Sequence, residues 1–337
     1  MIRVILFIVL PLVVAVAAAG DARQTREQFL ELVRPRKTEL QPEVVALGES
    51  GGLVREKVFF QSEPGQRVAM LIVRPKSPAL VKRPVVLALH GTRGRKEGME
   101  SWLIDLASRG FVACATDARW HGELAKGDYE DAIIQSFRTG KGHPWLYETV
   151  TDTIRAIDYL QTRPDVDGER IGMIGISMGG MNTWLTAAAD PRVKVAIPCI
   201  GVTSFGYQVE HAQHQARCAT LPRFHQVVAD ALGEPQITPR VAKEAWDKVL
   251  PGITGRFDCP AMLVAIAPRP LLILNGEKDE RCPLESVRQC YATAEAAYRS
   301  AGAADHLKMD VAPNTGHQVT EAQKALALDW FVRWLKP

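Results

Sequence analysis

Short apolar runs alternate with longer amphipathic segments along most of the chain. Runs that are apolar at nearly every position are typical of strands covered on both faces. They occupy residues 85–89, 111–116, 193–200 and 271–274, and further strands are expected at 170–176 and 307–311. Helices are expected between them, at residues 97–109, 145–161, 178–189, 284–300 and 320–335. This alternation predicts an α/β fold with a mostly parallel sheet and helices on both faces.

Two further β-rich runs come before this alternation. Residues 54–60 and 67–74 flank a polar turn that contains Pro64 and Gly65, which predicts an antiparallel hairpin and brings the expected sheet to eight strands. A chain of 337 residues with 47% hydrophobic content can bury one large core. We therefore expect one main domain over residues 53–337, preceded by an N-terminal extension over residues 21–52 that begins with a short helix at 22–33.

Residues 201–260 interrupt the alternation of strands and helices. The stretch contains several prolines, Trp246 and three histidines, His211, His214 and His225. An insertion of this size after a core strand predicts a cap over a site. Because the histidines lack a regular metal-ligand spacing, we interpret them as polar surface residues or substrate contacts.

The first 20 residues differ in kind from the rest. Arg3 is followed by an uncharged apolar run that ends in small residues at 17–20, the outline of a secretory signal peptide. An uncleaved membrane anchor is the alternative, because the run is nearly long enough to span a bilayer. The favoured prediction is an exported protein, periplasmic or extracellular, with no stable membrane insertion after cleavage.

The cysteines and the charge limit the other classes. An exported protein could form disulfides among its six cysteines. Cys114 and Cys199 lie in apolar runs and are expected to be free, whereas Cys282 with Cys290, or Cys218 with Cys259, are better placed for bridges. No zinc-like spacing of Cys and His occurs, so we predict no metal and no cofactor. The net charge of +3 is close to balance and argues against a nucleic-acid partner.

The chemistry centres on residues 175–179, Gly-Ile-Ser-Met-Gly. They fit the G-x-S-x-G nucleophile elbow, in which a serine sits on a sharp turn between a strand and a helix. The expected strand at 170–176 and helix at 178–189 supply that context. We therefore predict Ser177 as the nucleophile and the N–H of Met178 as one donor of an oxyanion hole. A Gly- and Ser-rich turn without chemistry is the alternative.

The partners of Ser177 are expected in loops after other strands. Thr92 follows the strand at 85–89, and its N–H is placed to complete the oxyanion hole. Asp279 and His317 follow the strands at 271–274 and 307–311, which gives the order serine, acid, histidine of α/β-hydrolases. Glu277 and Glu280 are the alternative acids. Trp120 and His121, in the loop after the strand at 111–116, could contact substrate, although packing roles are also open for both.

From residue 53 onwards the chain resembles the dienelactone hydrolase and acetyl xylan esterase-like branch of the α/β-hydrolase superfamily, which shades into prolyl oligopeptidase-type domains. The resemblance rests on Leu89-His90-Gly91-Thr92, the elbow, residues 265–276 (AIAPRPLLILNG) and Thr315-Gly316-His317. It implies Ser177 as nucleophile, Asp279 as acid, His317 as base, and the Thr92 and Met178 amides as the oxyanion hole. Dienelactone hydrolases proper have a cysteine nucleophile, so the serine here argues against a lactone substrate.

These observations predict an exported serine esterase that cleaves a carboxylic ester of a small molecule or carbohydrate through an acyl-enzyme. A peptidase or amidase of prolyl oligopeptidase type, with the same triad, is the second hypothesis. A non-catalytic binding protein on a hydrolase scaffold is the third. It is disfavoured because every triad member and oxyanion glycine is present. The sequence leaves the oligomeric state open.

Overall fold

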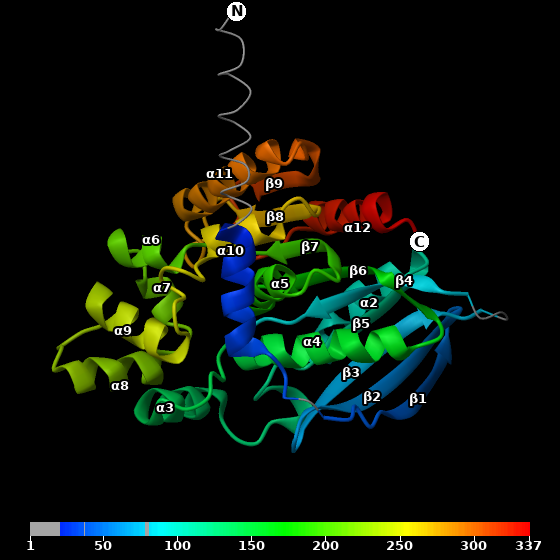
Figure 1. Cartoon of the computed structure of the whole chain (residues 1–337), viewed down its shortest axis with the longest axis horizontal. Coiled ribbons are helices and arrows are strands. Elements are labelled where there is room, and N and C mark those ends of the chain that lie inside the picture. The colour runs from blue at the N-terminus through cyan, green and yellow to red at the C-terminus, as the bar shows by residue number, and fades with distance from the viewer. Residues whose placement is uncertain (1–20, 37, 78–80) are drawn as a thin grey trace, which may run out of the picture.

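The structure, a computed structural model, describes residues 21–36, 38–77 and 81–337, so the predicted signal peptide lies outside the described residues. It contains one nine-stranded sheet in the order β1-β2-β3-β5-β4-β6-β7-β8-β9 (Figure 1). The strands are β1 Glu43–Ser50, β2 Leu53–Glu63, β3 Gln66–Pro75, β4 Arg83–Leu89, β5 Val112–Thr116, β6 Val166–Ile176, β7 Val193–Cys199, β8 Leu271–Gly276 and β9 Leu307–Ala312.

A helix over residues 21–33 precedes the sheet, and the other helices follow the strands as predicted for an α/β fold. They are α2 Glu100–Ser108, α3 Tyr129–Thr139, α4 Tyr147–Thr162, α5 Met178–Ala189, α6 Phe205–Glu210, α7 Gln215–Cys218, α8 Pro222–Leu232, α9 Pro239–Val249, α10 Cys259–Ile266, α11 Leu284–Ser300 and α12 Glu321–Leu335. Short 3-10 helices occupy η1 Lys96–Met99, η2 Gly122–Leu124 and η3 Ala304–His306.

The sheet is mostly parallel, as predicted, but it has nine strands rather than eight. β5, β4, β6, β7, β8 and β9 pair in parallel, whereas β1, β2 and β3 pair antiparallel at one edge. The strand that the prediction missed is β1, which pairs only with β2 and is exposed at every position. Because no residue of β1 is buried, it lacks the alternation of buried and exposed positions that marks a half-buried strand.

Alternate residues of the central strands serve two separate apolar layers. On β4, Val85, Leu87 and Leu89 belong to the layer that includes α4, α5, α10 and α11. Val86 and Ala88 belong to the layer that includes α2 and α12. Both faces of the sheet are therefore covered, which explains why β4 is apolar at nearly every position.

Residues 201–266 form helices α6 to α10, and α3 packs beside α8 and α9 at the same side of the sheet (Figure 1). The sequence did not predict α3, which lies in a polar stretch. Its ends explain the helix: Asp128 accepts hydrogen bonds from two N–H groups of the first turn, and Gly140 ends the helix in the left-handed conformation with φ of 65°.

Two of the three histidines in this insertion are buried, which corrects their interpretation as surface residues. His225 is fully buried, donates from Nδ1 to Leu221 O at 2.8 Å and accepts at Nε2 from Trp246 Nε1 at 3.0 Å. His214 is also buried and contacts Ile237 O, whereas His211 is exposed. Burial lowers the pKa of His225 to about 4, so the ring is a neutral part of the core between these helices.

All six cysteines are free and buried, so neither predicted bridge forms. The Cys282 thiol donates to Ile200 O, with 3.3 Å between Sγ and that oxygen. Cys290 lies on α11, and burial together with this neighbouring thiol raises the pKa of the Cys259 thiol of α10. The proposed partners Cys282 and Cys290 therefore serve different contacts. Among the described helices, none is both long enough and apolar enough to cross a membrane.

Candidate active site

Ser177 occupies a strained turn between β6 and α5, as the elbow motif predicts. Its φ of 55° and ψ of −112° are unusual for a residue with a side chain. Its N–H donates to Cys199 O at 2.9 Å, which ties the turn to β7. The flanking glycines are required by close packing: a Cβ on Gly175 would lie 2.1 Å from Gly179 O, and one on Gly179 would lie 2.2 Å from Leu89 O. The sequence therefore allows the turn to sit directly on the ends of β4 and β6.

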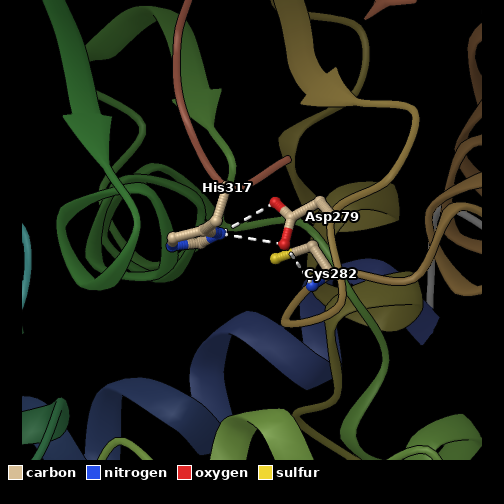
Figure 2. Close-up of side chains that lie close together, drawn as sticks. All are labelled: Asp279, Cys282 and His317. Atoms are coloured by element: carbon tan, nitrogen blue, oxygen red, sulfur yellow. Dashed lines mark hydrogen bonds and ion pairs between the residues drawn. The ribbon is translucent and has the colours of Figure 1, made fainter. Parts of the chain in front are cut away.

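The structure brings Ser177, Asp279 and His317 into one hydrogen-bonded chain. His317 Nε2 lies 2.8 Å from Ser177 Oγ, and His317 Nδ1 lies 2.9 and 2.8 Å from the two oxygens of Asp279 (Figure 2 shows the Asp279 and His317 pair). Each residue comes from a loop after a parallel strand, β6, β8 or β9. The Asp279 side chain has no exposed surface, whereas 17% of the His317 side chain is exposed.

The buried carboxylate of Asp279 is held by its own loop. Asp279 Oδ1 accepts from Arg281 N at 2.9 Å and from Cys282 N at 3.0 Å. The alternative acids are elsewhere: Glu277 accepts from Asn314 N at 2.7 Å, and Glu280 is exposed. The loop geometry thus presents only Asp279 to the histidine among the three acids that the sequence offered.

A small pocket lies in front of Ser177. Its walls come from the turn after β4, with Thr92, from the loop after β7, with Gly201, and from the inserted helices, with Arg217. His317 also lines it, and its volume is only about 20 Å³. A cavity of this volume holds roughly one water molecule. Other hollows of the surface are larger, but they lie away from the chemistry at Ser177.

The two predicted oxyanion residues flank this pocket. Met178 is fully buried as the first residue of α5, so its N–H belongs to the N-terminal turn of that helix. Thr92 lines the pocket from the turn after β4, where Gly94 N donates to Gly91 O at 2.9 Å. A helix N-terminus and a strand-ending turn therefore meet beside Ser177, an arrangement that can bind developing negative charge.

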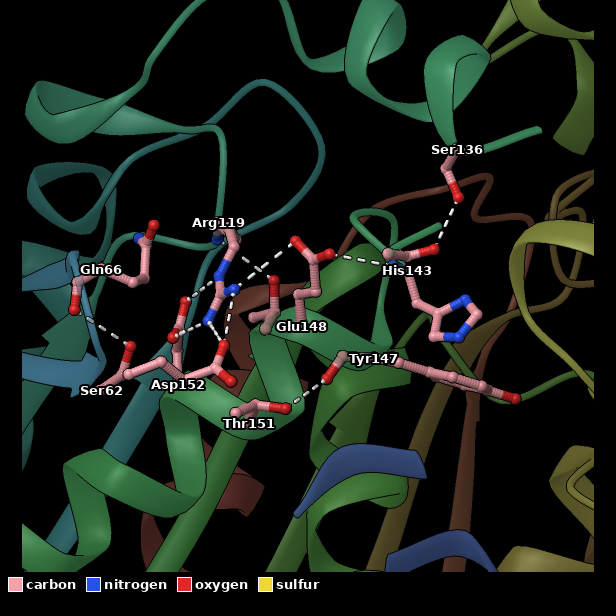
Figure 3. Close-up of polar contacts among 12 residues, drawn as sticks. Ser62, Gln66, Arg119, Ser136, His143, Tyr147, Glu148, Thr151 and Asp152 are labelled. Atoms are coloured by element: carbon pink, nitrogen blue, oxygen red, sulfur yellow. Dashed lines mark hydrogen bonds and ion pairs between the residues drawn. The ribbon is translucent and has the colours of Figure 1, made fainter. Parts of the chain in front are cut away.

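Trp120 and His121 do not line the pocket that holds Ser177. Their loop is anchored by Arg119, which donates from Nε to Asp152 at 2.8 Å and from both Nη atoms to Glu63 at 3.0 Å (Figure 3). The Trp120 ring lines a separate surface hollow. A substrate contact from Trp120 stays a prediction.

His121 is packed in the layer behind the pocket. Its ring centroid lies 4.4 Å from that of Tyr129, whose hydroxyl lies 3.4 Å from Met178 Sδ. Burial lowers the pKa of His121 to about 4, so the ring is neutral. The geometry indicates a packing role for His121 beneath Met178, while a contact of His121 with substrate stays a prediction.

Sequence reasoning missed most of the pocket wall, including Arg217 and Cys282. Cys282 Sγ, Asp279 and His317 place three possible metal-ligand atoms within 4.8 Å of one another (Figure 2). These atoms already have protein partners, and burial raises the pKa of the Cys282 thiol, which disfavours the thiolate that metals bind. The absence of a metal site stays a prediction. The signal for Arg217 is weak, because the residue stands alone in an irregular insertion.

Comparisons with known proteins match the chain to hydrolases. The model of the Dienelactone hydrolase family matches residues 68–227, and that of the BAAT / Acyl-CoA thioester hydrolase C terminal matches residues 154–321. "Putative hydrolase YtaP" of Bacillus subtilis is 27% identical over 328 residues, which cover 93% of this chain and 99% of that protein. "Dipeptidyl-peptidase 5" of Porphyromonas gingivalis is 24% identical over 82% of this chain but only 37% of that protein.

A solved structure is similar in fold to this chain. Acetyl xylan esterase 1 from Thermoanaerobacterium is similar in structure with a TM-score of 0.68, at 17% sequence identity over 93% of both chains. The sequence matches indicate a hydrolase, and the structural match shows the fold. The chain therefore has the α/β-hydrolase fold, and it is similar to dienelactone hydrolases in sequence and to an acetyl xylan esterase in structure.

Proposed function

We propose that the chain is an exported serine hydrolase that cleaves a carboxylic ester through an acyl-enzyme. The observation that carries the proposal is the chain of contacts from Ser177 Oγ through His317 to Asp279, with 2.8 Å between Oγ and Nε2. A serine hydroxyl needs a base within hydrogen-bond distance, and that base needs a carboxylate that holds its tautomer. No cofactor enters the proposal.

Each proton transfer in this mechanism has an acceptor in place. His317 Nδ1–H donates to Asp279, so Nε2 carries the lone pair that takes the proton of Ser177 Oγ as that oxygen attacks the ester carbonyl. The carbonyl oxygen becomes an oxyanion, and the N–H groups of Met178 and Thr92 bind it. His317 then returns the proton to the leaving alcohol, and a water repeats the sequence on the acyl-enzyme.

The pocket favours short acyl groups. The pocket beside Ser177 is small, so compact acyl groups are favoured over long alkyl chains. The substrate in this proposal is a small-molecule or carbohydrate ester with an acyl part as short as acetyl, bound beneath a cap formed by the insertion over residues 201–260. Hydrolysis of 4-nitrophenyl acetate should then exceed that of longer 4-nitrophenyl esters.

Replacement of the nucleophile tests the mechanism. Ser177→Ala should fold normally and lose about 10⁴- to 10⁶-fold in kcat on 4-nitrophenyl acetate, together with labelling by a fluorophosphonate probe. Ser101→Ala is the matched control, because Ser101 is an exposed residue of α2 far from this turn in the sequence, and it should keep full activity. A Ser177→Ala protein that retains a tenth of the activity would rule out the serine mechanism.

A peptidase is the second candidate, because a relative named as a dipeptidyl-peptidase aligns with 82% of this chain. The same contacts at Ser177 serve amide cleavage, in which His317 protonates the leaving amine. An aminoacyl 4-nitroanilide assayed beside 4-nitrophenyl acetate separates the two candidates. If the chain is an esterase, its kcat/KM for the ester should exceed its kcat/KM for the anilide by more than the difference in intrinsic reactivity between the two bonds.

Export is the remaining part of the proposal, and it rests on the sequence of residues 1–20. N-terminal sequencing of the mature protein from its native host tests it directly. A start near Asp21 in a periplasmic or extracellular fraction supports cleavage of a signal peptide. A protein that keeps residues 1–20 and sediments with membranes supports the anchor instead.

A further inference from the structure

Arg217 is a buried cation in the wall of the active-site pocket. It lies on α7 in the inserted helices, only 4% of its surface is exposed, and it lines the same pocket as Ser177 and His317. A buried guanidinium is strongly destabilising unless hydrogen bonds and an opposite charge compensate it. The contacts of Arg217 therefore show what compensation the protein itself provides.

The protein provides only part of the compensation that the buried guanidinium of Arg217 needs. Arg217 Nε donates to Gln208 Oε1 at 2.9 Å, and Nη2 donates to Arg281 O at 3.1 Å. The other contacts are sulfur atoms: Met181 Sδ at 2.9 Å from Nη1 and Cys282 Sγ at 3.8 Å from Nη2. Sulfur is a weak acceptor, and a guanidinium has five N–H donors. Among the described residues, no oxygen accepts from Nη1, and Arg281 O is the one oxygen that accepts from Nη2.

No carboxylate among the described residues lies within ion-pair distance of Arg217. Arg119, Arg163 and Arg192 each contact at least two carboxylates. Arg269 has no ion pair among the described residues either, but it donates five hydrogen bonds to backbone carbonyl oxygens, whereas Arg217 has only two oxygen acceptors. The acid of the site, Asp279, is already bound by His317 and by two backbone N–H groups. Among the described residues the charge of Arg217 therefore has no anionic partner within ion-pair distance, in the wall of the pocket that holds Ser177.

The guanidinium of Arg217 lies close to the reacting atoms. Cys282 Sγ lies 3.8 Å from Arg217 Nη2 and within 4.8 Å of the ligand atoms of Asp279 and His317, so a single sulfur atom separates the cation from the triad. The Phe205 ring covers one face of the guanidinium, with 4.7 Å between Cζ and the ring centroid. Only the edge of the guanidinium can then bind an anion, and an edge is what a carboxylate engages with two parallel hydrogen bonds.

We propose that the ester cleaved at Ser177 carries a free carboxylate close to its scissile bond, and that Arg217 binds this carboxylate. The inference rests on the proposed esterase function and adds the charge of its substrate. Arg217 acts as a specificity residue: it selects and orients the anionic ester, and it takes no part in proton transfer. The carboxylate belongs to either the acyl part or the alcohol part of the ester.

Paired esters that differ only in charge test the proposal on the full-length enzyme. Monomethyl succinate and dimethyl succinate place the carboxylate on the acyl side, and 4-acetoxybenzoate with its methyl ester places it on the alcohol side. Acid release is followed at constant pH. The wild-type enzyme should prefer the charged member of one pair by about tenfold to a hundredfold in kcat/KM, the range expected for a hydrogen-bonded charge pair.

Arg217→Gln should remove that preference by lowering the kcat/KM for the charged ester about tenfold or more relative to its neutral partner. Arg217→Lys, which keeps the charge but loses the paired donors, should retain part of the preference. Arg240→Gln is the matched control, because Arg240 is an exposed arginine of α9 that does not line the pocket, and it should leave the preference intact. Thermal unfolding confirms that each variant is folded.

Two results overturn the inference. One is a wild-type enzyme that cleaves the neutral member of both pairs as fast as the charged member, a test that needs no folded variant. The other is an Arg217→Gln enzyme that loses charged and neutral activity equally, as expected if the residue only tethers α7. In both cases inactivity of Ser177→Ala on 4-nitrophenyl acetate would leave the esterase proposal standing, whereas activity of that variant would remove the proposed function itself.

Discussion

Replacement of Asp279 by asparagine removes the negative charge of this side chain and keeps its shape. In the native loop Oδ1 accepts from Arg281 N and Cys282 N and lies 2.9 Å from His317 Nδ1, while Oδ2 lies 2.8 Å from the same nitrogen. The two backbone N–H groups need an acceptor, so the asparagine oxygen must stay on their side. Its NH₂ group then faces His317 Nδ1, which places a donor where the native residue has an acceptor.

The consequence for His317 is a change of tautomer. The NH₂ donor at the nearer position favours the tautomer in which Nδ1 accepts and the proton lies on Nε2, the atom 2.8 Å from Ser177 Oγ. Nε2 can no longer take the serine proton. We expect Asp279→Asn to lower kcat on 4-nitrophenyl acetate about 10⁴-fold, which corresponds to ~5 kcal/mol of barrier. Thermal stability should change little, because the backbone hydrogen bonds remain.

Glu277→Gln is the matched control two residues earlier in the same loop. Glu277 is exposed and accepts from Asn314 N at 2.7 Å, and glutamine keeps an oxygen for that contact. Its kcat should stay within about twofold of the wild type, since the residue does not contact His317. Retention of a tenth of the activity by Asp279→Asn, or a large loss in Glu277→Gln, would refute the assignment of Asp279 as the acid.

Three further predictions concern folding and stability. Gly179→Ala would place Cβ 2.2 Å from Leu89 O, so it should lower the free energy of unfolding by about 1–3 kcal/mol or more and reduce activity, as urea titration and an ester assay would show; wild-type values would contradict the packing argument. Burial lowers the pKa of His225 from 6.5 to about 4, so the unfolded chain binds the extra proton first, and stability should fall by ~3 kcal/mol as the pH drops from about 6.5 to 4. Urea titrations across this range should lose part of their pH dependence in His225→Gln, and an unchanged profile would count against the buried neutral ring. A chain that begins at Asp21 should be fully active in the ester assay because it keeps the helix over 21–33. Phe29→Ala removes a fully buried ring whose centroid lies 5.0 Å from that of Tyr147, so it should lower the free energy of unfolding by ~3–5 kcal/mol in the same titration.

The pattern of apolar positions was sufficient to predict most of the fold. Strands such as β4 and β7 are apolar at nearly every position because helices cover both faces, and this local signal needs no knowledge of partners. The exposed strand β1 lacked that signal because none of its residues is buried, although it pairs with β2 across a turn of only two residues, Gly51 and Gly52. The buried histidines of the inserted helices were misread for a related reason: burial is a property of the packed helices and not of the residue type.

Candidate triad residues could also be named from the sequence, since each follows a strand of the parallel sheet and such loops meet at one edge. The choice of Asp279 over Glu277 and Glu280 had only its place in the loop to support it, and the backbone hydrogen bonds that aim its carboxylate at His317 appear only in the folded loop.

Arg217 was beyond sequence reasoning altogether. It approaches the site from an insertion whose path depends on how helices α6 to α9 pack, and its missing carboxylate partner becomes visible only when all neighbours are in place. Local patterns were sufficient to predict eight of the nine strands, the turn at Ser177 and the serine-acid-histidine order, because these depend on apolar runs and on parallel-strand topology. The tertiary structure alone decided the charge and size of the pocket, because these depend on side chains that distant segments bring together.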